Sequence, residues 1–114
     1  MTVIIHLTIR LCLLINPTDN WQQAVKHAYH LAKAAADNHE LIGVFFYGTT
    51  ANILTDSKQQ AQWLTLSDTP LYICRTMIDN FNLSDELANQ AFEVIGMAPW
   101  VRLMEQADHI VEII

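Results

Sequence analysis

Short apolar runs alternate along this chain with segments of helical periodicity, and this alternation limits the folds that it can adopt. Continuous apolar runs bounded by turn residues are typical of strands that are buried on both faces of a sheet. Such runs occupy residues 11–15, 41–47, 70–73, 92–96 and 109–114. Strands that alternate with helices imply right-handed crossover connections between parallel strands. The sequence therefore predicts an α/β fold, a three-layer α/β/α domain with a mostly parallel sheet of about five strands.

The clearest helix is expected to begin at Trp21, because apolar side chains recur from there at three- and four-residue spacing. Asp19 or Asn20 supplies its N-cap, and Asn38 is expected to end it in the left-handed conformation. Residues 48–52 are predicted to form a loop. Further helices are predicted from Thr55 or Asp56 to residue 64, from the neighbourhood of Cys74, after Ser84, and around Pro99.

Composition indicates a single globular domain over residues 1–114. Apolar residues make up 52% of the chain and charged residues 16%, which excludes a disordered tail. Six basic and twelve acidic residues give a net charge of −6. This balance is the opposite of a basic surface that neutralises a phosphate backbone, so direct nucleic-acid binding is not expected.

The amino-terminal stretch is the one candidate for a targeting segment. The apolar run at residues 3–15 is interrupted by His6, Thr8 and Arg10, and it is shorter than the about 20 apolar residues of a membrane span. It also lacks the basic start and the small-residue cleavage site of a signal peptide. We therefore expect a cytoplasmic protein without a membrane segment, in which residues 1–9 extend the first strand or form an extra edge segment.

The placement of glycine and histidine argues against cofactors and metals. The turn at residues 16–19 contains no glycine that would let a backbone approach a pyrophosphate, so a dinucleotide-binding or P-loop role is not expected. His27 and His30 lie three residues apart on the polar side of the first helix, but no third ligand is suggested nearby. No cysteine pair has zinc-ligand spacing. The sequence therefore predicts neither a cofactor nor a metal site.

The two cysteines occupy different settings. Cys12 lies within an apolar run, where a thiol behaves as a small hydrophobe and its pKa tends upward, so we expect it to be inert. Cys74 follows a short strand and precedes a helix, and the functional crevice of open α/β sheets lies outside such strand ends. The helix start and the neighbouring Arg75 would favour a reachable thiolate or persulfide there. The alternative is a buried cysteine that fills space.

The order and spacing of four short segments carry a family resemblance. Leu-Ala-Lys-Ala-Ala-Ala-Asp-Asn-His-Glu-Leu at 31–41 runs into Val-Phe-Phe-Tyr at 44–47, and Leu-Tyr-Ile-Cys follows at 71–74. Phe-Glu-Val-Ile-Gly-Met at 92–97 and Asp-His-Ile-Val at 108–111 close the chain. From Arg10 onward the sequence resembles the DsrE/TusD sulfur-relay family, in which the strand at 71–74 would end in the sulfur-accepting cysteine.

This resemblance implies a sulfurtransferase subunit that accepts persulfide sulfur on Cys74 and relays it to a partner protein. In TusD-like proteins the sulfur serves 2-thiolation of the wobble uridine in tRNA, and in DsrE-like proteins it serves sulfur oxidation. The implied partners are sulfur donor and acceptor proteins and related DsrE-, DsrF- or DsrH-like subunits, with a stand-alone homo-oligomer as the alternative. We expect Arg75, Tyr47, Gly48 and Asn52 to support Cys74 and to shape its pocket.

A second hypothesis is a non-catalytic interaction subunit. In that case the fold serves assembly, Cys74 is idle, and apolar side chains within residues 81–87 form the interface.

Overall fold

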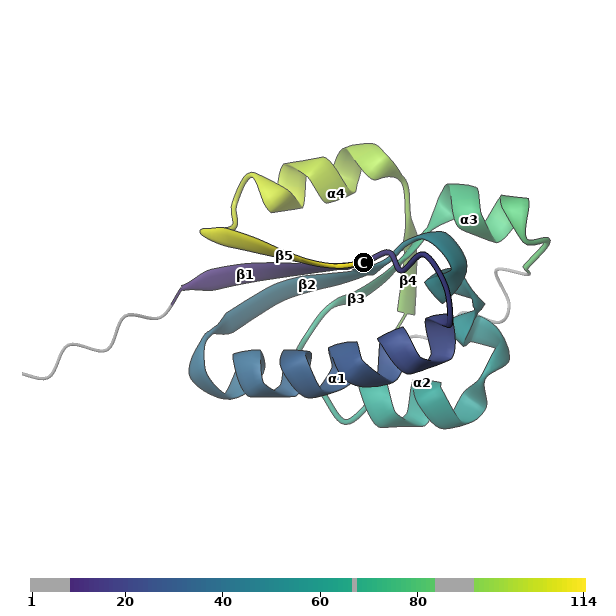
Figure 1. Cartoon of the computed structure of the whole chain (residues 1–114). Helices are drawn as coiled ribbons and strands as arrows, with labels where there is room; N and C mark the ends of the chain where they lie inside the picture. Colours follow the sequence, from purple (N-terminus) through teal and green to yellow (C-terminus); the bar gives the residue numbers. More distant parts are fainter. Residues whose placement is uncertain (1–8, 67, 84–91) are drawn as a thin grey trace, which may run out of the picture.

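A computed structural model describes residues 9–66, 68–83 and 92–114 of the chain. Within these residues the strands form one sheet in the order β4-β3-β2-β1-β5, and all neighbouring strands are parallel. The strands are β1 (Arg10–Ile15), β2 (Glu40–Phe46), β3 (Leu71–Cys74), β4 (Phe92–Ile95) and β5 (His109–Ile113). Each predicted strand is present with its ends shifted by no more than one residue, so the predicted α/β fold is confirmed (Figure 1).

Helices connect the strands. They are α1 (Trp21–Asn38), α2 (Ser57–Trp63), α3 (Arg75–Asn80) and α4 (Met97–Met104), with the 3-10 helix η1 (Gly48–Thr55) after β2. Helix α1 begins as predicted, because the side chain of Asn20 accepts a hydrogen bond from the N–H of Gln23. Asp56 caps α2 in the same way. The helix predicted after Ser84 lies outside the described residues, and none of the described helices has the length and apolar character needed to cross a membrane.

The end of α1 differs from its prediction. Asn38 is the last helical residue and is not left-handed, and its side-chain amide donates a hydrogen bond to the carbonyl oxygen of Ala34. His39 then takes an extended conformation with φ −139°. The physical reason is that β2 begins at Glu40, so the backbone has to become extended at once and has no room for a left-handed turn.

Residues 48–52, predicted as a loop, are part of the 3-10 helix η1. Ala51, Ile53 and Leu54 are buried against the core. A buried segment needs partners for its backbone polar groups, and the tight turns of a 3-10 helix supply them. The segment begins with a glycine and two threonines, which is the composition of a loop. The sequence therefore predicted a loop and not a 3-10 helix. The extra segment expected at residues 1–9 lies, apart from Ile9, outside the described residues.

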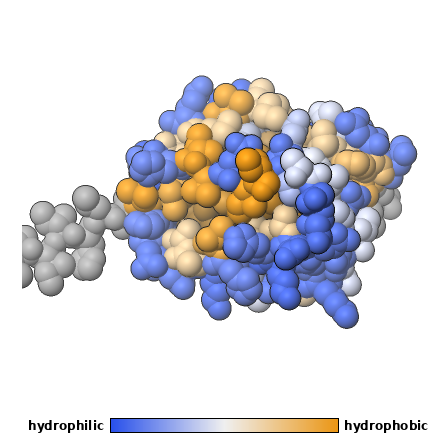
Figure 2. Space-filling view, in the orientation of Figure 1, coloured by the Kyte–Doolittle hydropathy of each residue, from blue (hydrophilic) through white to orange (hydrophobic). Residues whose placement is uncertain are grey.

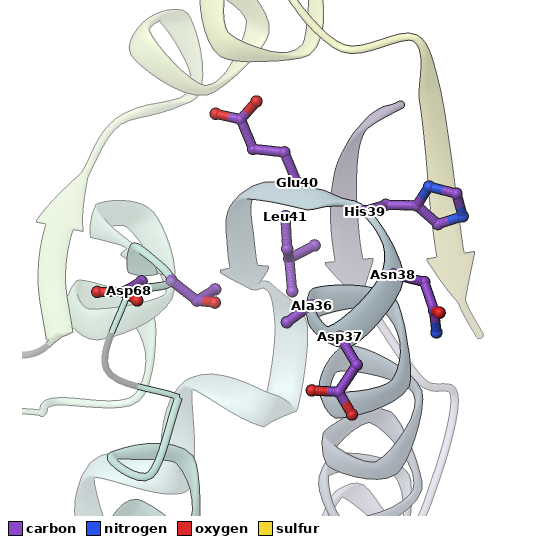
Figure 3. Close-up of a pocket in the computed structure, with 8 residues that line it drawn as sticks. Ala36, Asp37, Asn38, His39, Glu40, Leu41 and Asp68 are labelled. Carbon is purple, nitrogen blue, oxygen red and sulfur yellow. The ribbon is translucent and has the colours of Figure 1, made fainter. Parts of the chain in front are cut away.

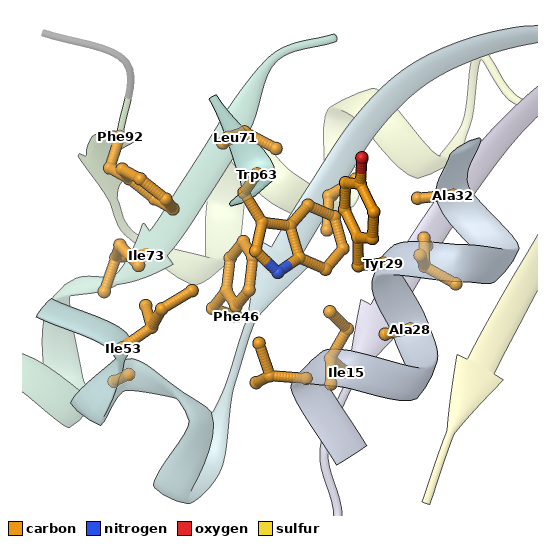
Figure 4. Packing of buried hydrophobic residues seen from close by; sticks show 14 of the residues in the cluster. Ile15, Ala28, Tyr29, Ala32, Phe46, Ile53, Trp63, Leu71, Ile73 and Phe92 are labelled. Carbon is orange, nitrogen blue, oxygen red and sulfur yellow. The ribbon is translucent and has the colours of Figure 1, made fainter. Parts of the chain in front are cut away.

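The sheet separates two apolar cores. Helices α1 and α2 cover one face and α4 covers the other (Figure 1). Under α1 and α2, the rings of Tyr29 and Phe46 meet Trp63 edge-on, with centroids 5.6 Å and 5.0 Å from that of Trp63 (Figure 4). The smaller core lies under α4, and we call it the α4 core. Its buried members are Cys12, Phe45, Cys74 and Trp100.

Strand β5 is an edge strand, paired with β1 alone among the described strands. Its side chains from His109 to Glu112 are all exposed, including Ile110 at 49% and Val111 at 42%. Figure 2 shows hydrophobic side chains gathered over β5 and beside it. An edge strand of this kind offers unpaired backbone groups together with apolar surface to another chain.

Candidate functional site

The carboxyl ends of β3 and β4 lie at a topological switch point. From β1 to β4 the sheet grows in one direction, and the chain then returns past β1 to form β5. Right-handed connections in opposite directions lie on opposite faces, so Ile78 of α3 packs into the core under α1, whereas Trp100 of α4 packs into the α4 core. Ligand crevices of open α/β sheets lie outside strand ends at such a point. Cys74 is the last residue of β3 and therefore lies at this point.

Cys74 itself is buried, with 2% of its surface exposed. It belongs to the α4 core together with Phe45 and Trp100, and its Cα is paired with that of Ile95 on β4. The half-buried side chains of Met77 and Ile95 pack against the same core. The thiol is thus at the strand end where the sequence predicts it, but apolar side chains cover it. Reaction with a second molecule requires those side chains to move.

Tyr47 is the predicted supporting residue that the structure brings to the same core. It is half-buried, packs against the α4 core, and meets the ring of Phe45 edge-on at a centroid distance of 6.1 Å. Arg75 is the first residue of α3 and is exposed. Arg75 and Cys74 are adjacent in sequence, but Arg75 faces solvent, whereas the Cys74 thiol faces the α4 core.

Gly48 and Asn52 shape the backbone of η1. Gly48 has φ +64°, and a Cβ at this position would lie 2.6 Å from Oδ1 of Asn16. The left-handed backbone therefore favours glycine, and a larger residue would also have to displace the side chain of Asn16. The side-chain amide of Asn52 donates a hydrogen bond to the carbonyl oxygen of Thr49 at 2.9 Å. These two residues position the segment after β2, and neither belongs to the core around Cys74.

Thr50 is a buried polar residue of η1 that the sequence interpretation passed over. Its Oγ1 lies 2.6 Å from the carbonyl oxygen of Tyr47 and 3.1 Å from that of Ile15. The hydroxyl therefore ties η1 to the carboxyl ends of β1 and β2. A threonine three residues after Tyr47, the end of the predicted apolar run, is the signal that could have revealed this contact.

Cys12 is fully buried in the middle of β1. Burial raises the pKa of its thiol to about 11, in the expected direction, and its Sγ lies 3.9 Å from the carbonyl oxygen of Leu103. Strand β2 lies between β1 and β3, so the two cysteine Cα atoms are at least about 10 Å apart. That separation is too large for a disulfide, and both thiols are free.

A groove of about 350 Å³ opens between α4 and the strands β3 and β4, and we call it the α4 groove. Its lining includes Tyr72 on β3, Glu93 and Ile95 on β4, Arg102 and Leu103 on α4, and Gln106 in the turn after α4. Tyr72, Ile95 and Leu103 also pack against the α4 core that contains Cys74. The sequence interpretation missed this groove because it forms only when α4 returns across the sheet.

Another cavity, of about 390 Å³, lies at the opposite end of the strands (Figure 3). The end of α1 and the start of β2 line it, including the carboxylates of Asp37 and Glu40, and Asp68 completes one side. Strand β2 begins at this cavity, whereas Cys74 ends the parallel strand β3. The length of the sheet therefore separates this acidic cavity from the candidate site.

Comparisons with known proteins agree with this architecture. The family model described as DsrE/DsrF-like matches residues 10–113. The conserved protein of unknown function BT1422 from Bacteroides thetaiotaomicron has a TM-score of 0.72 and 18% identity, over 91% of this chain and 94% of that chain. The protein of unknown function MTH1491 from Methanobacterium thermoautotrophicum has a TM-score of 0.69 and 15% identity, over 91% and 98% of the two chains.

The ychN protein from E. coli also has this fold, with a TM-score of 0.58 and 12% identity over 93% of this chain and 99% of that chain. At such identities the likeness concerns the fold alone. No curated protein matches the sequence.

Proposed function

Because the chain belongs to the DsrE/DsrF-like family, we propose that it is a sulfur-transfer subunit, which accepts persulfide sulfur on Cys74 and relays it to a partner protein. The observation that carries this proposal is the position of Cys74 at the last residue of β3, beside the switch point between β3 and β4. Open α/β sheets bind their ligands outside the carboxyl ends of strands at a switch point. Cys12, the other cysteine, is buried within β1 and has a raised pKa.

The transfer is an exchange in two steps. The Cys74 thiolate attacks the outer sulfur of a donor persulfide, the Sγ–S bond forms, the donor S–S bond breaks, and the donor leaves as a thiolate. An acceptor thiolate then attacks the outer sulfur of the Cys74 persulfide and restores the Cys74 thiolate. The transferred sulfur keeps its oxidation state throughout, so neither an oxidant nor a reductant is needed.

The acidic charge of the chain fits transfer of sulfur to a partner protein better than contact with nucleic acid. The net charge of −6 opposes binding to a phosphate backbone, so delivery of sulfur to tRNA in a TusD-like pathway would fall to a later carrier. The same chemistry would serve a DsrE-like pathway of sulfur oxidation. A second copy of the chain, or a related DsrE-, DsrF- or DsrH-like subunit, is supported as an assembly partner by the exposed apolar side chains of β5.

A second candidate function is a non-catalytic interaction subunit of the same family. The observation that favours it is the 2% exposure of Cys74, since a covered thiol reacts slowly with a second molecule. In this alternative the protein acts by binding other subunits through the apolar surface over β5. Of the interface predicted at residues 81–87, Phe81 is 38% exposed, and residues 84–87 lie outside the described chain.

Sulfur loading distinguishes the two candidates. The reduced protein is treated with a persulfide donor, and its mass is measured with and without later exposure to an acceptor thiol. We expect a gain of one sulfur atom that is lost to the acceptor, that persists in Cys12→Ala, and that is absent from Cys74→Ser. An equal gain in Cys74→Ser removes the proposal, and a wild-type protein that neither gains sulfur nor is alkylated at Cys74 at neutral pH supports the interaction subunit.

A further inference from the structure

The α4 groove lies on the same face of the sheet as the Cys74 side chain. Side chains of a strand alternate between faces, so Tyr72 and Cys74 of β3 lie on one face. Parallel pairing places Glu93 beside Tyr72 and Ile95 beside Cys74. Tyr72 and Glu93 form part of the groove wall, and they therefore lie two residues before Cys74 and Ile95 along the two strands.

The groove and the thiol also share a wall. Ile95 and Leu103 line the groove, and both pack against the α4 core in which Cys74 is buried. Ile95 is half-buried and sits at the carboxyl end of an edge strand. Displacement of side chains in this wall would therefore open a path from the groove to the sulfur.

The polar groups of the groove match a small molecule with charges of both signs. Arg102 presents a guanidinium from α4, which binds a carboxylate through two parallel hydrogen bonds. Glu93 presents a carboxylate from β4, which suits an ammonium group. Burial and the Glu93 carboxylate raise the pKa of Tyr72, so its hydroxyl keeps its proton and is able to donate a hydrogen bond. The apolar Ile95 and Leu103 suit a methylene and a sulfur atom.

The size of the groove favours a small molecule over a protein segment. Its volume of about 350 Å³ lies at the lower end of the range of small-ligand sites. A molecule of amino-acid size fits within such a volume, with room for its carboxylate on the Arg102 side and its ammonium on the Glu93 side.

We propose that the α4 groove binds a low-molecular-weight persulfide that carries a carboxylate, of the cysteine type, as the sulfur donor of Cys74. This inference rests on the proposed function and names its donor class. The Cys74 thiolate attacks the outer sulfur of the bound persulfide, the new Sγ–S bond forms, and the small molecule leaves as a thiolate that takes the electron pair of the broken S–S bond. Arg102 and Glu93 hold the donor and take no part in the exchange.

The test compares a donor that has the carboxylate with two donors that lack it. Sulfur loading of Cys74 is measured with cysteine persulfide, with cysteamine persulfide, which lacks the carboxylate, and with inorganic polysulfide. We expect Arg102→Gln to raise the half-saturating concentration of cysteine persulfide about tenfold, the scale of one lost charge-assisted hydrogen bond, without changing the rate at saturation. Loading from cysteamine persulfide and from polysulfide should stay the same. Arg10→Gln removes an equal charge from the exposed start of β1 and is the matched control.

An Arg102→Gln protein that loads from all three donors as the wild type does overturns the groove proposal and leaves the proposed function intact. A wild-type protein that takes sulfur from none of them overturns the proposed function. The groove is then tested by titration of cysteine into Cys74→Ser, followed by nuclear magnetic resonance. Shifts confined to the signals of Tyr72, Glu93, Arg102 and Gln106 support a binding groove, and their absence overturns it.

Discussion

Cys74 at the end of β3 and Ile95 at the end of β4 are paired across the parallel sheet, and both belong to the apolar packing under α4. One of these residues is buried and the other lines the α4 groove. The pairing places the Cys74 thiol beside an apolar side chain that borders the α4 groove. Access to the thiol is therefore expected to depend on how tightly Ile95 is packed.

Substitution of Ile95 by alanine should expose Cys74. A fully buried isoleucine costs about 2–5 kcal/mol on truncation, so the half-buried Ile95 should contribute about 1–2 kcal/mol to closure of the site. A change of that size corresponds to an increase of about 5–30-fold in the alkylation rate of Cys74 by iodoacetamide. The rate is measured by mass spectrometry of the labelled protein under native conditions.

Val94→Ala is the matched control for this experiment. Val94 precedes Ile95 on the same strand, is also half-buried, and packs against the core under α1. If truncation exposed Cys74 only by lowering the overall stability of the fold, labelling of Cys74 would be accelerated in both variants. Equal rates in Ile95→Ala and Val94→Ala would therefore contradict a specific role of Ile95 in covering the thiol.

The stability of the fold should fall in alkaline solution because of Cys12. Burial raises the pKa of this thiol from 9.0 to about 11, so above pH 9 the unfolded chain loses a proton that the folded chain keeps. The contribution is complete below pH 9 and is lost as pH rises toward 11, with a total of about 1–3 kcal/mol. The measurement is urea unfolding at pH 8 and at pH 10.5 for the wild type and for Cys12→Ala. Other groups titrate in both proteins, so a pH dependence that is the same in the two would show that Cys12 is not its source.

Gly48→Ala should destabilise the segment that follows β2. The backbone has φ +64° at this position, and the added Cβ would lie 2.6 Å from Oδ1 of Asn16. Left-handed strain and the steric contact together should lower the free energy of unfolding by about 1–3 kcal/mol, measured by chemical denaturation. In the double variant Gly48→Ala with Asn16→Ala the contact is relieved and the strain remains, so part of the loss should be recovered. Additive losses would show that the two residues do not interact.

The strands were the most predictable part of the fold because their signal is local. A run such as residues 11–15 is apolar on both sides only if helices cover both faces of the sheet, and the structure confirms this for β1. The end of α1 was predicted wrongly because two local signals compete there. Asn38 favours a left-handed stop, but the start of β2 at Glu40 determines the backbone.

The candidate site was predictable only in part. The position of Cys74 at a strand end follows from the short apolar run before it, and that position agrees with the structure. Its burial depends on Trp100, which reaches the same core only because α4 crosses back over the sheet. Contacts between segments so far apart in sequence leave no local pattern. For the same reason, Arg102 and Glu93 carry no sequence signal that would bring them to one groove.

The exposed edge of β5 should mediate assembly with a second copy of the chain. Ile110 and Val111 point to opposite faces of the sheet and are 49% and 42% exposed, so each face of this edge carries an exposed apolar side chain. Neither a lysine nor a proline occurs in β5, although such residues commonly prevent pairing at sheet edges. At micromolar concentration in sedimentation velocity, we expect the wild-type protein to be an oligomer and the Val111→Lys variant to be a monomer. Leu64→Lys adds the same charge at an apolar residue of similar exposure, 41%, just beyond α2, and should leave the oligomer unchanged. A monomeric wild type, or dissociation by both variants, would contradict an interface at β5.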